Sequence, residues 1–142
     1  MVLVAAVDRS AGAGTVVRRG RELAEAFDED LHVIHVLDRE AFYELDRTTV
    51  KQQQTWISNE EIEATAAEIA AETVGETAST ITAVGRIGDP AKQVVRYAGD
   101  VGARLIVIGR HKRSPVGKAV FGSVTQSVLL EATCPVVSVR TR

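Results

Sequence analysis

The sequence predicts an α/β fold in which helices cover both faces of a five-stranded parallel sheet. Five short runs are rich in β-branched residues and mostly apolar on both faces, which is typical of buried parallel strands. Segments with helical periodicity lie between these runs, and such alternation indicates a parallel sheet. With 142 residues, 45% of them hydrophobic, the chain is predicted to form one domain over residues 1–142. The predicted strands are 2–7, 31–37, 79–84, 104–109 and 135–140.

The first half of the chain is predicted to run from strand to helix to strand. A helix is expected over residues 12–27, where apolar positions recur at helical spacing. Residues 38–57 follow the second strand and are too long for a tight connection. This segment contains Trp56, Phe42 and Tyr43, and we expect either a flap or an extension of the next helix.

Two helices of the second half are predicted from their N-terminal residues. Ser58 and Glu61 have the spacing of a capping box, in which the serine side chain accepts a backbone hydrogen bond from the glutamate position. Asp89 and Pro90 combine an N-cap acid with a proline at the first helical position.

The last helix is expected to follow Gly122. Ser123 and Gln126 have the S-x-x-Q spacing of a further capping box, which makes Ser123 the expected N-cap. The same periodicity predicts that Val124, Val128 and Leu129 face inward.

Charge is unevenly distributed along a chain whose net charge is −2. Residues 22–76 contain 15 acidic and 3 basic residues, whereas residues 86–142 contain 3 acidic and 10 basic residues. Such runs indicate either solvated helix faces or, in the C-terminal third, an anion site. The basic residues that crowd together there are Arg110, Lys112, Arg113 and Lys118.

Several features predict a cytoplasmic protein without a membrane segment. The opening MVLVAAVD lacks a basic lead-in and a cleavage site, and Asp8 interrupts it far short of a membrane span. Cys134 is the one cysteine and cannot form an internal disulfide, in agreement with a reducing compartment.

The predicted topology places a candidate phosphate site beyond the first and fourth strands. Asp8 ends the first strand and Gly109 ends the fourth, and ligands of open α/β sheets bind beyond the carboxyl ends of strands. Gly122 permits close approach of an anion to the backbone. Ser123 begins a helix whose unpaired N–H groups and positive dipole end favour phosphate, although a capping role alone also explains this serine.

Other motifs exclude several function classes. Gly117-Lys118 lacks the earlier glycine and the following hydroxyl of a Walker A loop, and the DRSAGAG turn lacks the third glycine of a dinucleotide-binding loop. His32 and His35 leave opposite faces of a strand and cannot share a metal. We find no catalytic group of residues, so we expect a protein that is not an enzyme. Nucleic-acid binding is disfavoured because the chain lacks an aromatic platform and a strongly basic total.

The glycine spacing after the fourth strand resembles that of the universal stress protein family. The family pattern is G-x2-G-x9-G-[ST], and this chain has Gly109, Lys112, Gly122 and Ser123 at these positions. The segments VAAVDRS, HVLD, GDPAKQVVRYA and CPVVSVR extend the resemblance over nearly the whole chain. It implies a three-layer Rossmann-like (adenine nucleotide α-hydrolase-like) sandwich with strand order 3-2-1-4-5.

The resemblance also implies an ATP site in the crevice between the first and fourth strands. Ala6 and Asp8 would lie beside adenine and ribose, and Val36 would offer a backbone contact to the base. Gly109 would lie beneath the ribose and first phosphates, and Ser123 with Val124 would hold the outer phosphates. Mg²⁺ or Mn²⁺ would enter only with the nucleotide. The full set of expected nucleotide-binding residues is Ala6, Asp8, Val36, Gly109, Arg110, His111, Lys112, Arg113, Gly122, Ser123, Val124 and Thr125.

Lys112 stands where the family pattern has its second glycine, and it leaves two hypotheses open. Its ammonium, with Arg110 and Arg113, would neutralise phosphate in a stress-response regulatory protein that binds ATP or a related adenine nucleotide. Alternatively the lysine blocks nucleotide, and the protein acts through dimerisation and protein contacts. The resemblance places residues 135–140 at a sheet edge that would pair two copies in a homodimer. An α-hydrolase of the same architecture would carry an S-G-G-x-D-S-like loop where this chain has DRSAGAG.

Overall fold

Five parallel strands form the main sheet of the computed structural model, which describes residues 1–45, 57–75, 81–110, 112–113, 119–120 and 122–141. The strands are β1 (Val2–Ala6), β2 (Asp30–Leu37), β3 (Ile81–Ile87), β4 (Leu105–Arg110) and β7 (Val136–Arg140). Their order is β3-β2-β1-β4-β7, with every pair parallel. The predicted α/β class and the strand order 3-2-1-4-5 are therefore confirmed.

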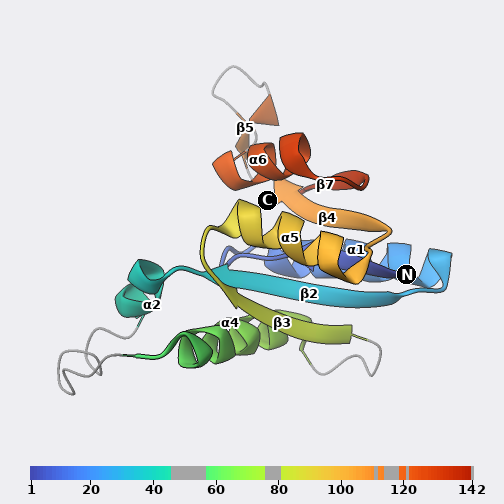
Figure 1. Cartoon of the computed structure of the whole chain (residues 1–142). Helices are drawn as coiled ribbons and strands as arrows, with labels where there is room; N and C mark the ends of the chain where they lie inside the picture. Colours follow the sequence, from blue (N-terminus) through green and yellow to red (C-terminus); the bar gives the residue numbers. More distant parts are fainter. Residues whose placement is uncertain (46–56, 76–80, 111, 114–118, 121, 142) are drawn as a thin grey trace.

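Helices cover both faces of this sheet (Figure 1). Helices α1 (Ala13–Phe27) and α4 (Asn59–Val74) pack on one face, and α5 (Pro90–Val101) and α6 (Ser123–Glu131) pack on the other. The central strands are buried on both faces, because side chains from β1 and β4 fill both core clusters. Each fully buried aliphatic side chain contributes roughly 1.5–3 kcal/mol through removal of apolar surface from water. The core thus fixes the sheet whose carboxyl edge carries the candidate site.

The N-terminal signals of α4 and α5 are confirmed. The Ser58 hydroxyl accepts a hydrogen bond from the Glu61 N–H at 3.2 Å, and the Asp89 carboxylate accepts one from the Lys92 N–H at 3.0 Å. Pro90 occupies the first turn of α5, where its missing N–H has no cost.

The predicted start of α6 after Gly122 is confirmed, but its predicted N-cap is wrong by one residue. Gly122 is the N-cap, with an extended backbone, and its carbonyl accepts a hydrogen bond from the Gln126 N–H at 2.9 Å. Ser123 is therefore the first helical residue, and among the described residues no side-chain hydrogen bond caps this helix. The predicted inward face holds only in part: Val128 is fully buried, whereas Val124 and Leu129 are 37% and 38% exposed.

The segment after β2 forms a separate short helix, α2 (Arg39–Leu45), and residues 46–56 lie outside the described residues. It is not an extension of α4, because Ser58 caps the start of that helix. Phe42 and Ile57 pack with Ile62 in a small core cluster of their own. Phe42 and Tyr43 of this segment therefore contribute to a local core, while Trp56 lies outside the described residues.

Strand ends differ from the prediction where tertiary pairing decides them. β3 continues to Ile87, three residues beyond the predicted end, because it pairs with β2 along its whole length. Gly85 permits α4 to pack closely against β3, since an added Cβ would lie 2.1 Å from the Glu63 carbonyl oxygen of α4. Two short strands, β5 (Lys112–Arg113) and β6 (Ala119–Val120), were not predicted and pair antiparallel.

Cys134 is partly buried against the α5 core cluster, and burial raises the pKa of its thiol. Among the described residues, no helix combines the length and the apolar character needed to cross a bilayer.

Candidate functional site

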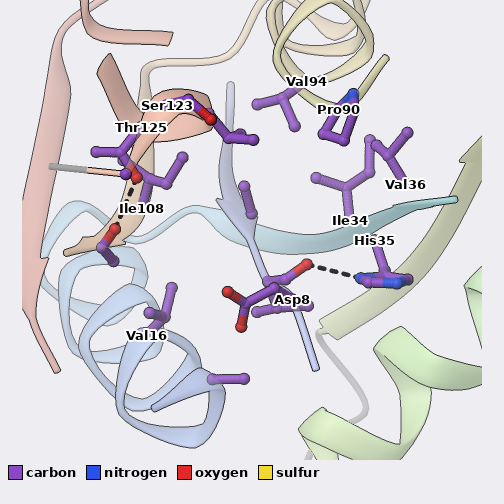
Figure 2. A pocket seen from close by; sticks show the side chains of 16 residues that line it. Asp8, Val16, Ile34, His35, Val36, Pro90, Val94, Ile108, Ser123 and Thr125 are labelled. Carbon is purple, nitrogen blue, oxygen red and sulfur yellow. Dashed lines mark hydrogen bonds between the residues drawn. The ribbon is translucent and has the colours of Figure 1, made fainter. Parts of the chain in front are cut away.

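A cavity of about 280 Å³ opens at the carboxyl ends of β1, β2 and β4 (Figure 2). The chain enters helices α1, α5 and α6 beside it, so six elements contribute to its wall. This is the position at which open α/β sheets bind ligands. The lining residues are Ala6, Val7, Asp8, Ala13, Val16, Ile34, His35, Val36, Pro90, Val94, Ile108, Gly109, Gly122, Ser123, Val124 and Thr125.

One wall of the cavity is apolar. Ile34 and Val36 come from β2, Ile108 from β4, and Val94 from the first turns of α5, and all four are buried. Pro90 adds its ring at the start of α5. Branched aliphatic side chains on two sides form a slot that suits a flat apolar group.

Asp8 supplies a carboxylate at the opposite edge of the cavity (Figure 2). It follows β1 after one intervening residue, Val7, and is exposed. One of its oxygens accepts a hydrogen bond from the Ser10 N–H at 2.9 Å, which fixes the side chain in the turn between β1 and α1. Carboxylate oxygens can accept hydrogen bonds from ligand hydroxyl groups.

His35 is a cavity residue that the sequence analysis did not assign to the site. Its side chain is 6% exposed, and Nδ1 lies 2.8 Å from the carbonyl oxygen of Val7. Because a carbonyl can only accept, Nδ1 carries the proton and donates. Burial lowers the pKa of His35, which keeps the imidazole neutral, while Asp8 acts in the opposite direction. The other ring nitrogen, Nε2, is buried without a hydrogen-bond partner among the described residues.

The two strand histidines are separate, as predicted. His32 Nδ1 lies 2.6 Å from the hydroxyl of Tyr97 on α5, whereas His35 contacts the turn after β1. Among the described residues, no group of three His, Cys, Asp or Glu side chains is placed to hold a metal ion.

The N-terminus of α6 forms the third side of the cavity. Gly122, Ser123 and Thr125 all line it, and Thr125 is buried with its hydroxyl donating to the Gly109 carbonyl at 2.8 Å. That bond ties the first turn of α6 to the end of β4. Gly122 has no side chain that could cap α6, so among the described residues the first N–H groups of this helix are available to an anion in the cavity.

The structure brings eight of the twelve predicted residues together around this cavity: Ala6, Asp8, Val36, Gly109, Gly122, Ser123, Val124 and Thr125. Arg110 does not line it; this residue ends β4, and its carbonyl accepts hydrogen bonds from Thr141. His111 lies outside the described residues, and only the backbone of Lys112 and Arg113, in β5, is described.

The remaining lining residues were missed because their apolar side chains look like ordinary core in the sequence. Val94 faces both the core and the cavity, and nothing in its helical spacing separates the two. His35 had one usable signal, namely its position near the carboxyl end of a buried strand.

Comparison with known proteins adds independent findings. The universal stress protein family model matches residues 1–140. A universal stress protein from Mycolicibacterium smegmatis is 40% identical over 52 residues, a match that spans 37% of this chain and only 40% of that relative. A solved universal stress protein from Archaeoglobus fulgidus is 32% identical, with 97% of each chain covered and a TM-score of 0.61. A structure of the universal stress protein from the same organism in complex with dAMP is 27% identical, covers 97% of this chain and 96% of that one, and has a TM-score of 0.55.

Proposed function

Because this chain belongs to the universal stress protein family, we propose that its cavity binds an adenine nucleotide, ATP or a close relative, as a regulatory ligand. We propose a binding protein rather than an enzyme. The observation that carries this proposal is the combination, in one cavity, of an apolar slot, the Asp8 carboxylate and the uncapped N-terminus of α6.

These three features match the three parts of a nucleotide. The slot between Val36 and Ile108 suits the base, and Asp8 suits the ribose hydroxyl groups. The N–H groups after Gly122 suit the phosphates, and Mg²⁺ or Mn²⁺ would arrive with them. The related structure that holds dAMP supports the same ligand class.

Calorimetric titration with ATP, AMP and dAMP tests the proposal. Asp8→Ala removes an acceptor for the sugar, and Gly122→Val places a branched side chain at the phosphate end. A Cβ added to Gly122 meets no heavy atom of the described residues within 4 Å, so we expect this variant to keep its fold and to weaken binding. Gly99→Val is the matched control, since Gly99 is also open but lies on α5 away from the cavity. Absence of heat at millimolar nucleotide, with no competition against a fluorescent ATP analogue, contradicts the proposal.

Lys112 variants test how the loop contributes. If the ammonium neutralises phosphate, affinity falls as salt rises and falls again in Lys112→Ala. Lys112→Gly then binds with less dependence on salt. If Lys112→Gly creates binding that the native protein lacks, the lysine is a natural block and the alternative function below is favoured.

A second candidate function, action through contacts between copies, is favoured by the exposed edge of β7. The Pro135 carbonyl accepts a hydrogen bond from the Ile106 N–H, and the Thr141 N–H donates one to the Arg110 carbonyl. The backbone N–H and C=O groups of the odd-numbered residues of β7 therefore point toward β4. The backbone groups of Val136 and Ser138 therefore face outward at the end of the sheet. The nearby helix α6 presents Leu130 at 78% exposure. Long edges with unpaired backbone groups pair with a second chain, and two-fold pairing closes into a dimer.

Size-exclusion chromatography with light scattering tests this candidate. Ser138→Pro deletes an outward N–H and converts a dimer to a monomer while the pairing of β7 with β4 is retained. Val137→Pro is the contrasting variant: its N–H faces β4, so it lowers the free energy of unfolding as well. A native protein that elutes with monomer mass at tens of micromolar contradicts a dimer.

A further inference from the structure

A second hollow of about 260 Å³ lies between β3 and α5, and the nucleotide cavity does not include it. Gln93, Arg96, Tyr97 and Asp100 line it from α5, at spacings of three, four and seven residues that define one helix face. Arg86 lines it from β3. Pro90 and Val94 of the same helix face the nucleotide cavity, so α5 contributes a different face to each hollow.

Two guanidinium groups, those of Arg86 and Arg96, line this hollow. Among the described residues, no ion pair joins Arg86 or Arg96 to a carboxylate, although Asp100 lines the same hollow. Arg104 provides an internal comparison. Its guanidinium lies over the Phe27 ring at 4.8 Å and pairs with Glu29 at 3.1 Å.

Arg86 also lies over an aromatic ring, as Arg104 does. Its guanidinium lies 5.0 Å from the centre of the Tyr97 ring, and Nη1 donates to the Gly85 carbonyl at 2.8 Å. Among the residues that the structure describes, no carboxylate pairs with this stacked cation as Glu29 pairs with Arg104. Like charges in one hollow repel, and an anion bound between them removes that repulsion.

The hollow is held in shape before any ligand enters. The Tyr97 hydroxyl lies 2.6 Å from His32 Nδ1, which fixes the ring beneath Arg86. Gln93 packs against Gly88, where an added Cβ would lie 3.0 Å from the Gln93 amide nitrogen. Gly88 has a φ of +134°, a conformation that favours glycine, so this contact depends on the residue type. Side chains fixed in advance lose less entropy when they bind.

We propose that this hollow binds phosphate, either as the free ion or as the phosphate group of a small monoester. Paired guanidinium groups and an amide donor match the oxygens of a tetrahedral oxyanion. Asp100 selects among such ions, because a carboxylate accepts a hydrogen bond from a phosphate that still carries a proton. Sulfate carries no proton near neutral pH and leaves Asp100 opposed to a negative charge.

Titration by ¹H–¹⁵N NMR, with Gly122→Val as the background to remove anion binding at α6, tests the proposal. Inorganic phosphate is expected to shift saturably the backbone signals of Gly88 and Tyr97 and the side-chain amide of Gln93. Arg86→Gln and Arg96→Gln each weaken binding by about tenfold or more, since each removes charge-assisted hydrogen bonds. Arg96 is exposed, so its variant keeps the fold. Arg18→Gln, which removes an exposed arginine of α1, is the control and leaves the affinity unchanged.

Titrations with two ligands distinguish the free phosphate ion from a phosphate monoester. Tighter binding of inorganic phosphate identifies the free ion, and tighter binding of glycerol 3-phosphate identifies a monoester. Phosphate binds more tightly than sulfate, and Asp100→Asn abolishes that preference. The proposal is overturned if the three reporter residues do not shift, if Arg96→Gln behaves like Arg18→Gln, or if sulfate and phosphate bind equally. Because Gly122→Val removes anion binding at the N-terminus of α6, this titration reports on the hollow at Arg86 alone. A negative result therefore contradicts phosphate binding in that hollow and leaves the proposed nucleotide binding in the other cavity untouched.

Discussion

Replacement of Thr125 by valine removes one hydrogen bond that joins α6 to the sheet. The Thr125 hydroxyl donates to the Gly109 carbonyl at 2.8 Å, and the threonine is 5% exposed. β1 pairs with β4 only as far as Ile108, so the Gly109 carbonyl lies beyond that ladder. Valine keeps the shape of threonine and deletes the donor, which leaves this carbonyl without the Thr125 bond.

The magnitude follows from the burial of this bond. A hydrogen bond contributes about 0.5–1.5 kcal/mol net, whereas a buried acceptor left without a donor costs about 1–3 kcal/mol. We therefore expect Thr125→Val to lower the free energy of unfolding by about 2 kcal/mol. For a chain of this length that corresponds to a fall in Tm of roughly 6–8 °C. Nucleotide affinity falls as well, because the bond positions the first turn of α6.

Urea denaturation and nucleotide titration measure the two effects. Thr65→Val is the matched control, since its hydroxyl also donates to a backbone carbonyl, that of Glu61 at 3.1 Å, but on the exposed surface of α4. It should change the free energy of unfolding by less than about 0.5 kcal/mol. Equal losses in the two variants would refute the assigned role of the Thr125 bond.

Two further predictions concern packing and pH. Gly85→Ala places a Cβ 2.1 Å from the Glu63 carbonyl oxygen and should lower the free energy of unfolding, measured by urea denaturation, by about 3 kcal/mol or more. Gly99 lies in open space on α5, so Gly99→Ala should raise the free energy of unfolding by about 0.5–1 kcal/mol. Similar values for the two variants would contradict the close contact at Gly85. Burial lowers the pKa of both His32 and His35 below the ordinary value of 6.5, so the unfolded chain binds more protons in acid. The contribution of these neutral histidines to the free energy of unfolding should therefore be fully present above about pH 6.5 and decrease as the pH falls below that value. The decrease should be less steep in His35→Gln. A free energy of unfolding that does not change below about pH 6.5 in the native protein would contradict this assignment.

The sheet was predictable because its signal is local. Buried parallel strands are apolar on both faces, and this pattern located all five within a few residues. Ends were less predictable, since the extension of β3 to Ile87 depends on pairing with β2. The N-cap of α6 was misassigned for a similar reason. Ser123 has the residue type of a cap, but the extended backbone of Gly122 lets the glycine carbonyl begin the helix.

The site was predictable where it depends on strand ends and glycines. Asp8, Gly109 and Gly122 follow from the carboxyl edge of the sheet and the motif spacing. The apolar wall was not predictable, because Val94 has the same sequence pattern as any core residue of an amphipathic helix. The hollow at Arg86 was also missed, since its residues come from two elements that only the fold brings together.

Lys112 illustrates how the structure changes the meaning of a departure from a motif. A positive φ favours glycine, and among the described residues Asp28 is the one non-glycine residue with a positive φ, so Lys112 has a negative φ. Lys112 lies in β5 and pairs with Val120, so its backbone does not need glycine. The two positions that border the cavity, Gly109 and Gly122, keep the glycines of the motif. The effect of this lysine on nucleotide binding therefore depends on its side-chain charge and volume, which the Lys112→Ala and Lys112→Gly variants separate.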